Sequence, residues 1–326
     1  MQLNIYKHSG MSLVELMVAM LISLFLTAGL FTMFNMSSSN VTTTSQFSEL
    51  QENGRIALVL MEKDISQLGF MGDITGTDLI FNVNAAVSAT AITNDCIGAG
   101  LNNSTFPLNV PAHFRRLWGY EKIASGPALS CGSSFTPQDN TDVIQIKRLV
   151  GPSVLAANRQ ATRYYAAVTS NAINFFDGNG AVPNMLNSRL WEYQHHVYFI
   201  KNDGSIPVLR RKTLTITNGM NNEDQLVEGI ENIRILYGFD NNGDSSPDRF
   251  IPASAVSTFM WDNQGFQRLV ALKLFVMVRT SQEDKSYDNK IIYKLGDKTI
   301  GPLNDHYRRK VMSTTVVLEN PVLINS

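Results

Sequence analysis

The chain has 326 residues, a formal net charge of −1 and 17% charged residues. That length can bury a substantial core, and the balanced charge excludes a protein drawn as a whole to nucleic acid or to an anionic membrane surface. Hydrophobic residues make up 44% of the chain and are concentrated near the N-terminus.

The N-terminal segment MQLNIYKHSGMSLVE places a short polar leader before an apolar run. From Leu16 to Ser48 the chain carries no charge, and residues 16–34 are almost purely apolar. At ~1.5 Å per residue, a helix over these residues nearly spans the ~30 Å hydrocarbon layer of a bilayer. The sequence therefore predicts one membrane-spanning helix, with the rest of the chain on one side of the membrane.

The carboxylate of Glu15 at the mouth of this run is unusual, because an ionised group there costs free energy unless it is paired. A secretory signal would also carry a small-residue cleavage site after the apolar run, and none follows Phe34. Gly10, the hydrophobic Met11 and Glu15 together resemble the class III signal of type IV prepilins and type II secretion pseudopilins. The alternative is a plain signal anchor whose Glu15 reaches the membrane surface.

This resemblance implies that a membrane prepilin peptidase cuts after Gly10 and methylates the new N-terminus at Met11. It also implies that Glu15 of one subunit neutralises the amine of a neighbour, because two charges in a low dielectric are tolerated together and costly apart. The family usually has Phe at the first mature position, so Met11 is a departure, though a hydrophobic one.

An amphipathic pattern follows the anchor. The polar stretch 37–45 has poor helix propensity, but apolar residues then recur at three- and four-residue spacing, which is typical of one helix face. These residues are Phe47, Leu50, Gly54, Ala57, Met61, Ile65 and Leu68. We therefore expect a leader at 1–10, a transmembrane and filament-core helix at 11–36, an amphipathic helix of the head at 37–70, and a β-rich head at 71–326.

The head begins with a long stretch, 73–137, that is rich in Gly, Asn, Ser, Thr and Pro and is expected to be irregular. It contains the two cysteines of the chain, Cys96 and Cys131. In an exported domain they would pair and close this insertion, whereas in the cytosol they would stay free. No further Cys or His stands at a spacing that suits zinc.

Runs rich in β-branched and aromatic residues follow, separated by turn sequences such as DGNG and NDG. Six strands are expected, at 143–149, 190–201, 208–217, 230–239, 269–280 and 311–318. One long helix followed by many strands predicts an α+β, pilin-like fold in which the helix packs on an antiparallel sheet.

Three stretches resemble one subgroup of the prepilins more closely than the others. ENGRIALVLMEKDISQLGF (52–70), LVEGIENIRILYGFDNNGD (226–244) and RRKVMSTTVVLENP (308–321) resemble segments of PilW-type minor pilins. Relatives often carry a cysteine just after the first helix, where this chain reads GFMGD. The segment 75–185 carries no such resemblance.

The loop FDNNGDSSPDRF offers oxygen side chains at Asp240, Asn242, Asp244 and Asp248. Their spacing resembles the start of a calcium-binding loop, although Ser245 stands where such a loop needs Gly and Ile251 where it needs Glu. The alternative is a surface turn rich in Asp and Asn. The sequence requires no cofactor, and Ca²⁺ at this loop is the one candidate metal.

Basic residues cluster at 115–116, 210–212 and 308–310. They could form a DNA-binding patch, or they could be solvated ends of strands, which is commoner. The neighbours His195 and His196 would point to opposite faces of a strand and so could not share a metal. No nucleophile, metal or phosphate-loop motif appears, so we predict no enzyme activity and no small-molecule substrate.

The sequence predicts a minor pilin that helps to start assembly of a type IV pilus near its tip. Its partners would be other minor and major pilins, the prepilin peptidase and the inner-membrane assembly machinery. It would sit in the inner membrane with a periplasmic head and then enter the pilus at the cell surface. The alternatives are a J-type minor pseudopilin of type II secretion, and a pilus-borne adhesin or DNA receptor.

Overall fold

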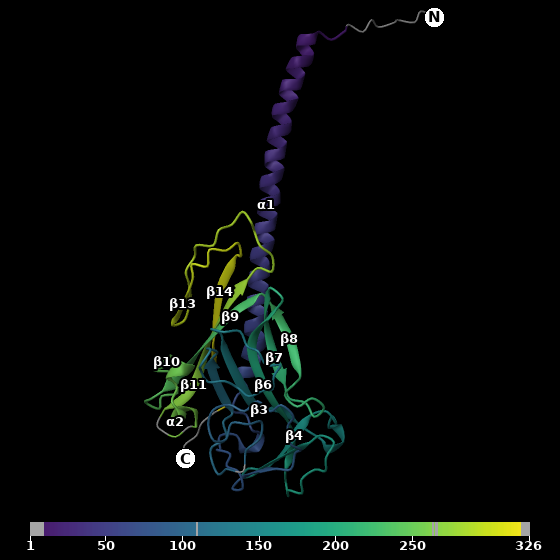
Figure 1. Cartoon of the computed structure of the whole chain (residues 1–326). Helices are drawn as coiled ribbons and strands as arrows, with labels where there is room; N and C mark the ends of the chain where they lie inside the picture. Colours follow the sequence, from purple (N-terminus) through teal and green to yellow (C-terminus); the bar gives the residue numbers. More distant parts are fainter. Residues whose placement is uncertain (1–9, 109, 263, 265–266, 321–326) are drawn as a thin grey trace, which may run out of the picture. The chain divides into compact units, whose positions relative to one another are not determined.

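The computed structural model describes residues 10–108, 110–262, 264 and 267–320. Residues 1–9 of the expected leader and Pro321 of the C-terminal stretch lie outside this range. Helix α1 (Leu13–Ile65) is continuous, and the chain divides into two compact units, residues 1–49 and 50–326. The second unit is the head, shown with α1 in Figure 1.

The polar stretch does not interrupt α1. The hydroxyls of Thr42, Thr44 and Ser48 each donate to the carbonyl four residues earlier, at 2.8–3.1 Å. This bonding keeps the side chains on the helix instead of offering the backbone another conformation. The helix ends at Ile65, and Gly69 follows with a φ of 82°, a conformation that favours glycine.

The C-terminal part of α1 belongs to the core of the head. Leu50, Ala57, Met61 and Ile65 are fully buried, as the apolar spacing predicts, whereas Phe47 is 42% exposed and lies in the first unit. At Gly54 a Cβ atom would stand 2.5 Å from Met312 Sδ, so glycine here allows a close approach between helix and sheet.

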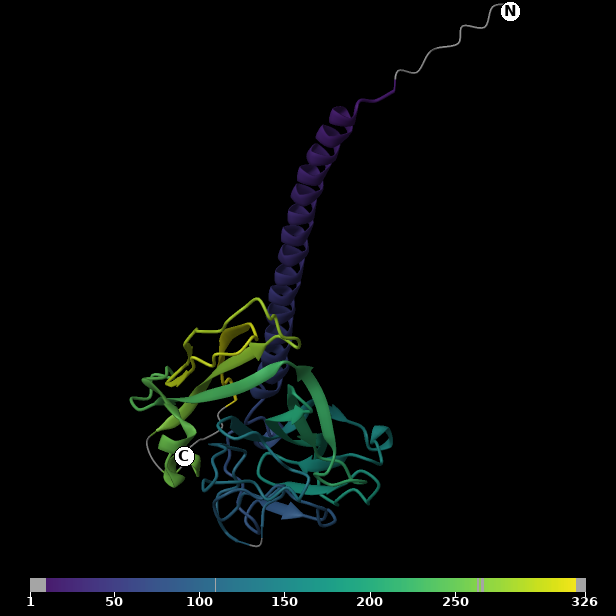
Figure 2. The ribbon, with the colours of Figure 1, turned by 45° about the horizontal axis from the view of Figure 1, so that its top comes forward.

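The head contains an eight-stranded, a four-stranded and a two-stranded sheet. In the first the order is β1-β5-β4-β6-β3-β2, with β7 on β6 and β8 on β7; in the second it is β10-β9-β11-β14; and β12 pairs with β13. The green-to-yellow and blue-to-teal groups of strands lie side by side in Figures 1 and 2. Among the described strands only β1 and β5 pair in parallel. The predicted α+β fold is confirmed.

The strand bounds are β1 Ala85–Val87, β2 Leu117–Glu121, β3 Asp142–Val154, β4 Tyr164–Val168, β5 Ile173–Asp177, β6 Arg189–Asp203, β7 Ile206–Thr213, β8 Glu223–Glu228, β9 Ile230–Asp240, β10 Arg249–Pro252, β11 Arg268–Arg279, β12 Tyr293–Leu295, β13 Lys298–Ile300 and β14 Arg309–Val317. Short helices are η1 Gly72–Ile74, η2 Ala156–Asn158, η3 Ala253–Ala255 and α2 Thr258–Trp261.

All six expected strands are present as β3, β6, β7, β9, β11 and β14. The strand expected to end at Thr217 stops at Thr213, because the Thr215–Gly219 bridge turns the chain there. The stretch expected to be irregular, 73–137, also contains β1 and β2. Both are short edge strands. They are stabilised by pairing with β5 and β3, and their own sequence carries no strand pattern that would predict them.

Candidate processing and assembly site

Glu15 lies at the start of α1 and closes a reciprocal cap with Ser12. The backbone N–H of Ser12 donates to Glu15 Oε2 at 2.8 Å, and the backbone N–H of Glu15 donates to Ser12 Oγ at 3.2 Å. This capping box satisfies two amides that a helix N-terminus leaves without partners. A carboxylate is also favoured there by the positive end of the helix dipole.

Met11 directly precedes the cap, so cleavage after Gly10 would create an amine two residues from the helix start. The cap occupies Oε2 of Glu15, which also has a second oxygen. Glu15 is exposed, so its carboxylate is accessible to a neighbouring chain as well as to its own helix. The charge of Glu15 was predicted to matter from the sequence, whereas its capping role was not predicted, although the spacing Ser-x-x-Glu indicates it.

The stem beyond the cap is apolar and uncovered. Among the described residues α1 is the one helix long and apolar enough to span a membrane, and none of its most apolar window is buried. Large side chains along it, such as Leu24, Phe25 and Phe31, are all more than 60% exposed. An apolar surface of this extent needs lipid or other stems around it.

In the head, Cys96 and Cys131 form a disulfide that closes a loop with a sequence separation of 35. Both cysteines are buried, and Cys96 lies beside a polar network that joins the insertion to the large sheet. Gln145 Nε2 donates to Cys96 O at 2.8 Å and to His195 Nε2 at 2.9 Å. Because His195 Nε2 accepts from Gln145, the proton of the neutral ring is assigned to Nδ1, which donates to Thr105 Oγ1 at 2.8 Å.

His196 contacts a different group, Asp64, at 2.6 Å from its Nδ1. The two histidines therefore serve opposite faces of β6, as the strand periodicity predicts, and they share no ligand. Burial and the nearby Lys147 charge hold the pKa of His195 well below its usual range.

Lys147, on β3, is fully buried within the same network. Its ammonium donates to Asn103 Oδ1 and to Arg115 O, both at 2.9 Å, and lies 4.8 Å from the centre of the Phe114 ring. Burial lowers the pKa of Lys147 to about 7. The burial of Lys147 was not predicted from the sequence, because a lysine in an alternating strand usually faces water.

The free energy of unfolding should rise by about 2 kcal/mol between pH 7 and pH 9 on account of Lys147. Over this range the unfolded chain keeps the lysine proton and the folded chain has largely released it, so a rising pH favours the folded state. Urea unfolding of the full-length protein in detergent at both values measures this rise. Lys147→Met should remove it, and an unchanged rise in that variant would contradict the assignment.

The acidic loop at 240–248 folds as a turn that uses its own backbone. Asp240 is buried and accepts from the amides of Asn242, Gly243 and Ser245 at 2.7–2.9 Å. Burial raises the pKa of Asp240, but these bonds outweigh it and lower the pKa overall. Among the described residues no group of three His, Cys, Asp or Glu side chains is arranged to hold a metal ion.

Calcium binding at this loop stays a prediction. Asn242 Nδ2 lies 3.2 Å from both Asp244 Oδ2 and Asp248 Oδ1, so three of the four predicted ligands lie close together, whereas Asp240 accepts from backbone amides. Calorimetric titration of the full-length protein in detergent should show Ca²⁺ binding that Asp244→Ala abolishes. Identical titrations of the two proteins would leave the loop as a surface turn.

Four of the eight residues in the basic clusters are buried, which differs for these four from both expectations. Arg115, Arg116, Lys212 and Arg309 are each at most 7% exposed. Arg115 pairs with Asp262 through two nitrogens, one of them at 2.9 Å. These charges are met largely inside the head, which removes the argument for a DNA-binding patch that rested on them.

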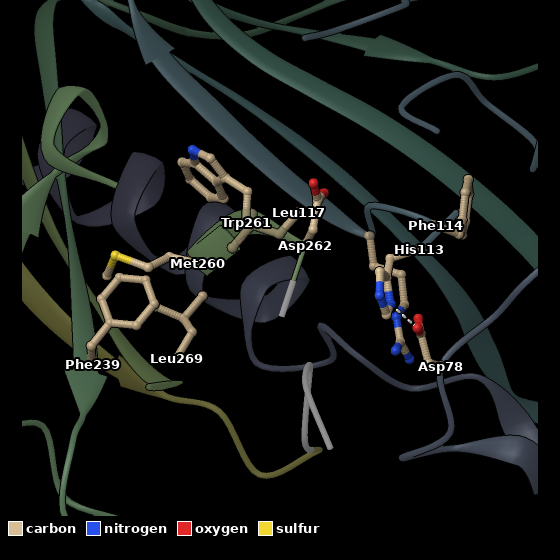
Figure 3. A pocket seen from close by; sticks show the side chains of 10 residues that line it. Asp78, His113, Phe114, Leu117, Phe239, Met260, Trp261, Asp262 and Leu269 are labelled. Carbon is tan, nitrogen blue, oxygen red and sulfur yellow. Dashed lines mark hydrogen bonds and ion pairs between the residues drawn. The ribbon is translucent and has the colours of Figure 1, made fainter. Parts of the chain in front are cut away.

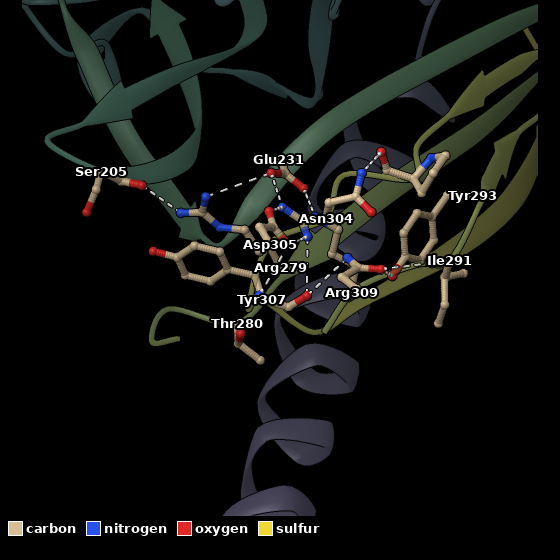
Figure 4. Close-up of polar contacts among 12 residues, drawn as sticks. Ser205, Glu231, Arg279, Thr280, Ile291, Tyr293, Asn304, Asp305, Tyr307 and Arg309 are labelled. Atoms are coloured by element: carbon tan, nitrogen blue, oxygen red, sulfur yellow. Dashed lines mark hydrogen bonds and ion pairs between the residues drawn. The ribbon is translucent and has the colours of Figure 1, made fainter. Parts of the chain in front are cut away.

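Figure 4 shows the cluster around Arg309, which joins β14 to β9 and to the segment 280–308. Arg309 Nη2 donates to Glu231 Oε1 at 2.9 Å and to Asp305 Oδ2 at 2.6 Å. Beside it, Arg279 donates to Ser205 O at 2.6 Å and lies 4.0 Å from the centre of the Tyr307 ring. The cluster therefore helps to fix a long connection that is also held by the apolar packing of Tyr293 and Leu295 against Met277.

Arg309→Met should lower the free energy of unfolding by about 3 kcal/mol, because it leaves Asp305 without its cation and Glu231 with only the 3.8 Å contact to Arg279. Chemical unfolding of the full-length protein in detergent measures the loss. Lys310→Met is the matched control, since among the described residues Lys310 makes no ion pair, and it should change stability by less than ~0.5 kcal/mol. Equal effects of the two substitutions would contradict the role of the cluster.

A small cavity of about 20 Å³ lies between the insertion and the four-stranded sheet (Figure 3). Its walls carry Phe239, Met260 and Trp261 on one side and the His113–Asp78 ion pair on the other. That volume suits about one water molecule and is too small for a substrate.

Comparison with protein families gives two matches. Residues 5–31 match the prokaryotic N-terminal methylation motif, and residues 197–320 match the type IV pilus-assembly protein W. A search of curated proteins and a search of solved structures each found no match. The second match includes the stretches at 226–244 and 308–320, whereas the stretch at 52–70 lies outside it.

A methylation motif on an uncovered apolar stem, followed by an α+β head, defines a type IV prepilin-like, membrane-anchored pilin. More particularly, residues 197–320 are similar to the type IV pilus-assembly protein W, which supports a pilus-related, PilW-like minor pilin. The predicted resemblance is confirmed. The matched families are structural components of pili.

Proposed function

We propose that this minor pilin helps to start assembly of a type IV pilus and lies near its tip. Before assembly it is held in the inner membrane by its stem, with the head in the periplasm. The observation that carries the proposal is the position of Glu15, exposed at the start of an uncovered apolar helix. Glu15 of one stem can pair with the amine that cleavage would create at Met11 of a neighbouring stem when the two stems lie in register.

The size of the head supports a low-copy subunit. Residues 50–326 form a compact unit with its own core, which is far more than is needed to cover the side of a filament. A head of this kind suits contacts with several different pilins. The proposed partners are other minor pilins and the major pilin, and the prepilin peptidase would act first, at Gly10.

Deletion of the gene tests the proposal. Surface pili, counted by electron microscopy, should fall at least about tenfold, and the wild-type chain should restore them. Secretion of exoproteins should be unchanged. Normal piliation with lost exoprotein secretion would instead assign the chain to a type II secretion system as a J-type pseudopilin.

A further inference from the structure

An open groove of about 460 Å³ lies within the head, along the end of α1 and the large sheet. Its lining comes from the last turns of α1, from strands β3, β6, β7 and β8, and from the short connections beside them. It is separate from the stem, since every lining residue lies between Leu60 and Asp224, inside the second compact unit.

The two carboxylates in the groove are already committed to the chain's own donors. Asp64 accepts from Arg148 Nε at 2.6 Å, His196 Nδ1 at 2.6 Å and Tyr198 Oη at 2.7 Å. Burial would raise the pKa of Asp64, but these partners hold it below its usual range. Asp224 pairs with Arg211 at 3.1 Å, so neither acid can serve an incoming cation.

Not all basic side chains of the groove are neutralised by ion pairs within the chain. Four of them line it, Lys63, Arg148, Arg163 and Arg211, against the two lining acids and the Glu192 that pairs with Arg163, which leaves a surplus of one positive charge on a chain whose net charge is −1. Arg163 makes one ion pair, a 3.4 Å contact with Glu192. Lys63 is exposed and makes no ion pair within the described part of the chain.

We infer that this groove binds an acidic segment from the head of a neighbouring pilin subunit, with Lys63 and Arg163 contacting its carboxylates. The volume can take a few side chains of an extended segment. Arg148, His196 and Tyr198, fixed by Asp64, form a rigid floor, and a rigid floor reduces the ordering cost of binding. Charge complementarity would select the acidic partner and speed its encounter. The inference rests on the proposed function, because it needs other pilins beside the chain.

A photo-crosslinking residue at Asn222 tests this in cells that carry the full-length chain. Asn222 lines the groove and is partly exposed, and its side chain makes no hydrogen bond to the other described residues. We expect an adduct with another pilin, mapped by mass spectrometry to a segment with at least two Asp or Glu residues. Adding Lys63→Gln and Arg163→Gln should lower the adduct yield about tenfold, since each lost charge contact costs roughly 1 kcal/mol or less.

Lys285→Gln with Lys290→Gln is the matched control, because both lysines are exposed and lie outside the groove. This pair should leave the adduct unchanged. An adduct that maps to a segment without acidic residues, or one that is insensitive to Lys63 and Arg163, would overturn the inference. So would the absence of an adduct while other pilins still co-purify with the chain. If no other pilin co-purified with the wild-type chain, the proposed function itself would be refuted.

Discussion

Glu15→Ala should be cut after Gly10 as efficiently as the wild type, yet its incorporation into pili should fall at least about tenfold. Removing one partner of a desolvated ion pair costs ~3–5 kcal/mol, because the other charge stays behind without compensation. Here the remaining charge would be the amine at Met11 of a neighbouring subunit. Immunoblots of sheared pili against whole cells measure incorporation, and the mass of the mature chain reports cleavage.

The alanine variant removes two functions together, since Glu15 also caps α1 through the amide of Ser12. Glu15→Gln separates them: glutamine can accept the same backbone bond in a capping box but carries no charge. If ion pairing drives assembly, both variants should be excluded from pili. Normal incorporation of the glutamine variant would show that the cap, and not the charge, is what assembly needs.

Replacing both Cys96 and Cys131 by alanine should lower the free energy of unfolding of the head by about 4 kcal/mol. The disulfide closes a loop with a sequence separation of 35, and the entropy of an open loop of that length gives this magnitude. The loop it closes contains one short strand, β2, and its other anchors are buried side chains such as Phe106, Phe114 and Trp118. Urea unfolding of the full-length protein in detergent, followed by near-ultraviolet circular dichroism, measures the loss.

Reduction of the wild type under the same conditions provides the control. Its unfolding midpoint should move to that of the double variant, and the reductant should leave the double variant unaffected. Equal midpoints for oxidised wild type and double variant would mean that the network of Gln145 and His195 holds the insertion without the disulfide.

Local patterns predicted most of the fold. Apolar spacing identified the buried face of α1 from Leu50 onward, and alternation identified β9, where Ile233, Ile235 and Tyr237 are all buried. The short strands β1 and β2 escaped prediction because their stability comes from partners far along the chain. Periodicity describes a segment by itself and carries no information about a pairing between distant strands.

The candidate sites also divide into those that are local in the sequence and those that only the fold assembles. The leader and Glu15 lie within the first fifteen residues, so the sequence alone is enough to predict them. The groove gathers Lys63, Arg148, Arg163 and Arg211 from separate elements, and only the folded chain brings them together. The buried basic residues were misjudged for a related reason: the acids that make burial of Arg115 and Arg309 tolerable lie 147 and 78 residues away along the chain, at Asp262 and Glu231.

Helix α1 supplies both the apolar stem and part of the core of the head, without a break at the polar stretch. A mechanical load on the stem is therefore carried by one hydrogen-bonded helix directly into that core. To pull the helix free, such a load would have to drag Leu50, Ala57, Met61 and Ile65 out of their packing at the same time. The resistance of this subunit to tension therefore depends on the folding stability of its head. Substitutions that destabilise the head should also make the subunit easier to pull out of a pilus under load.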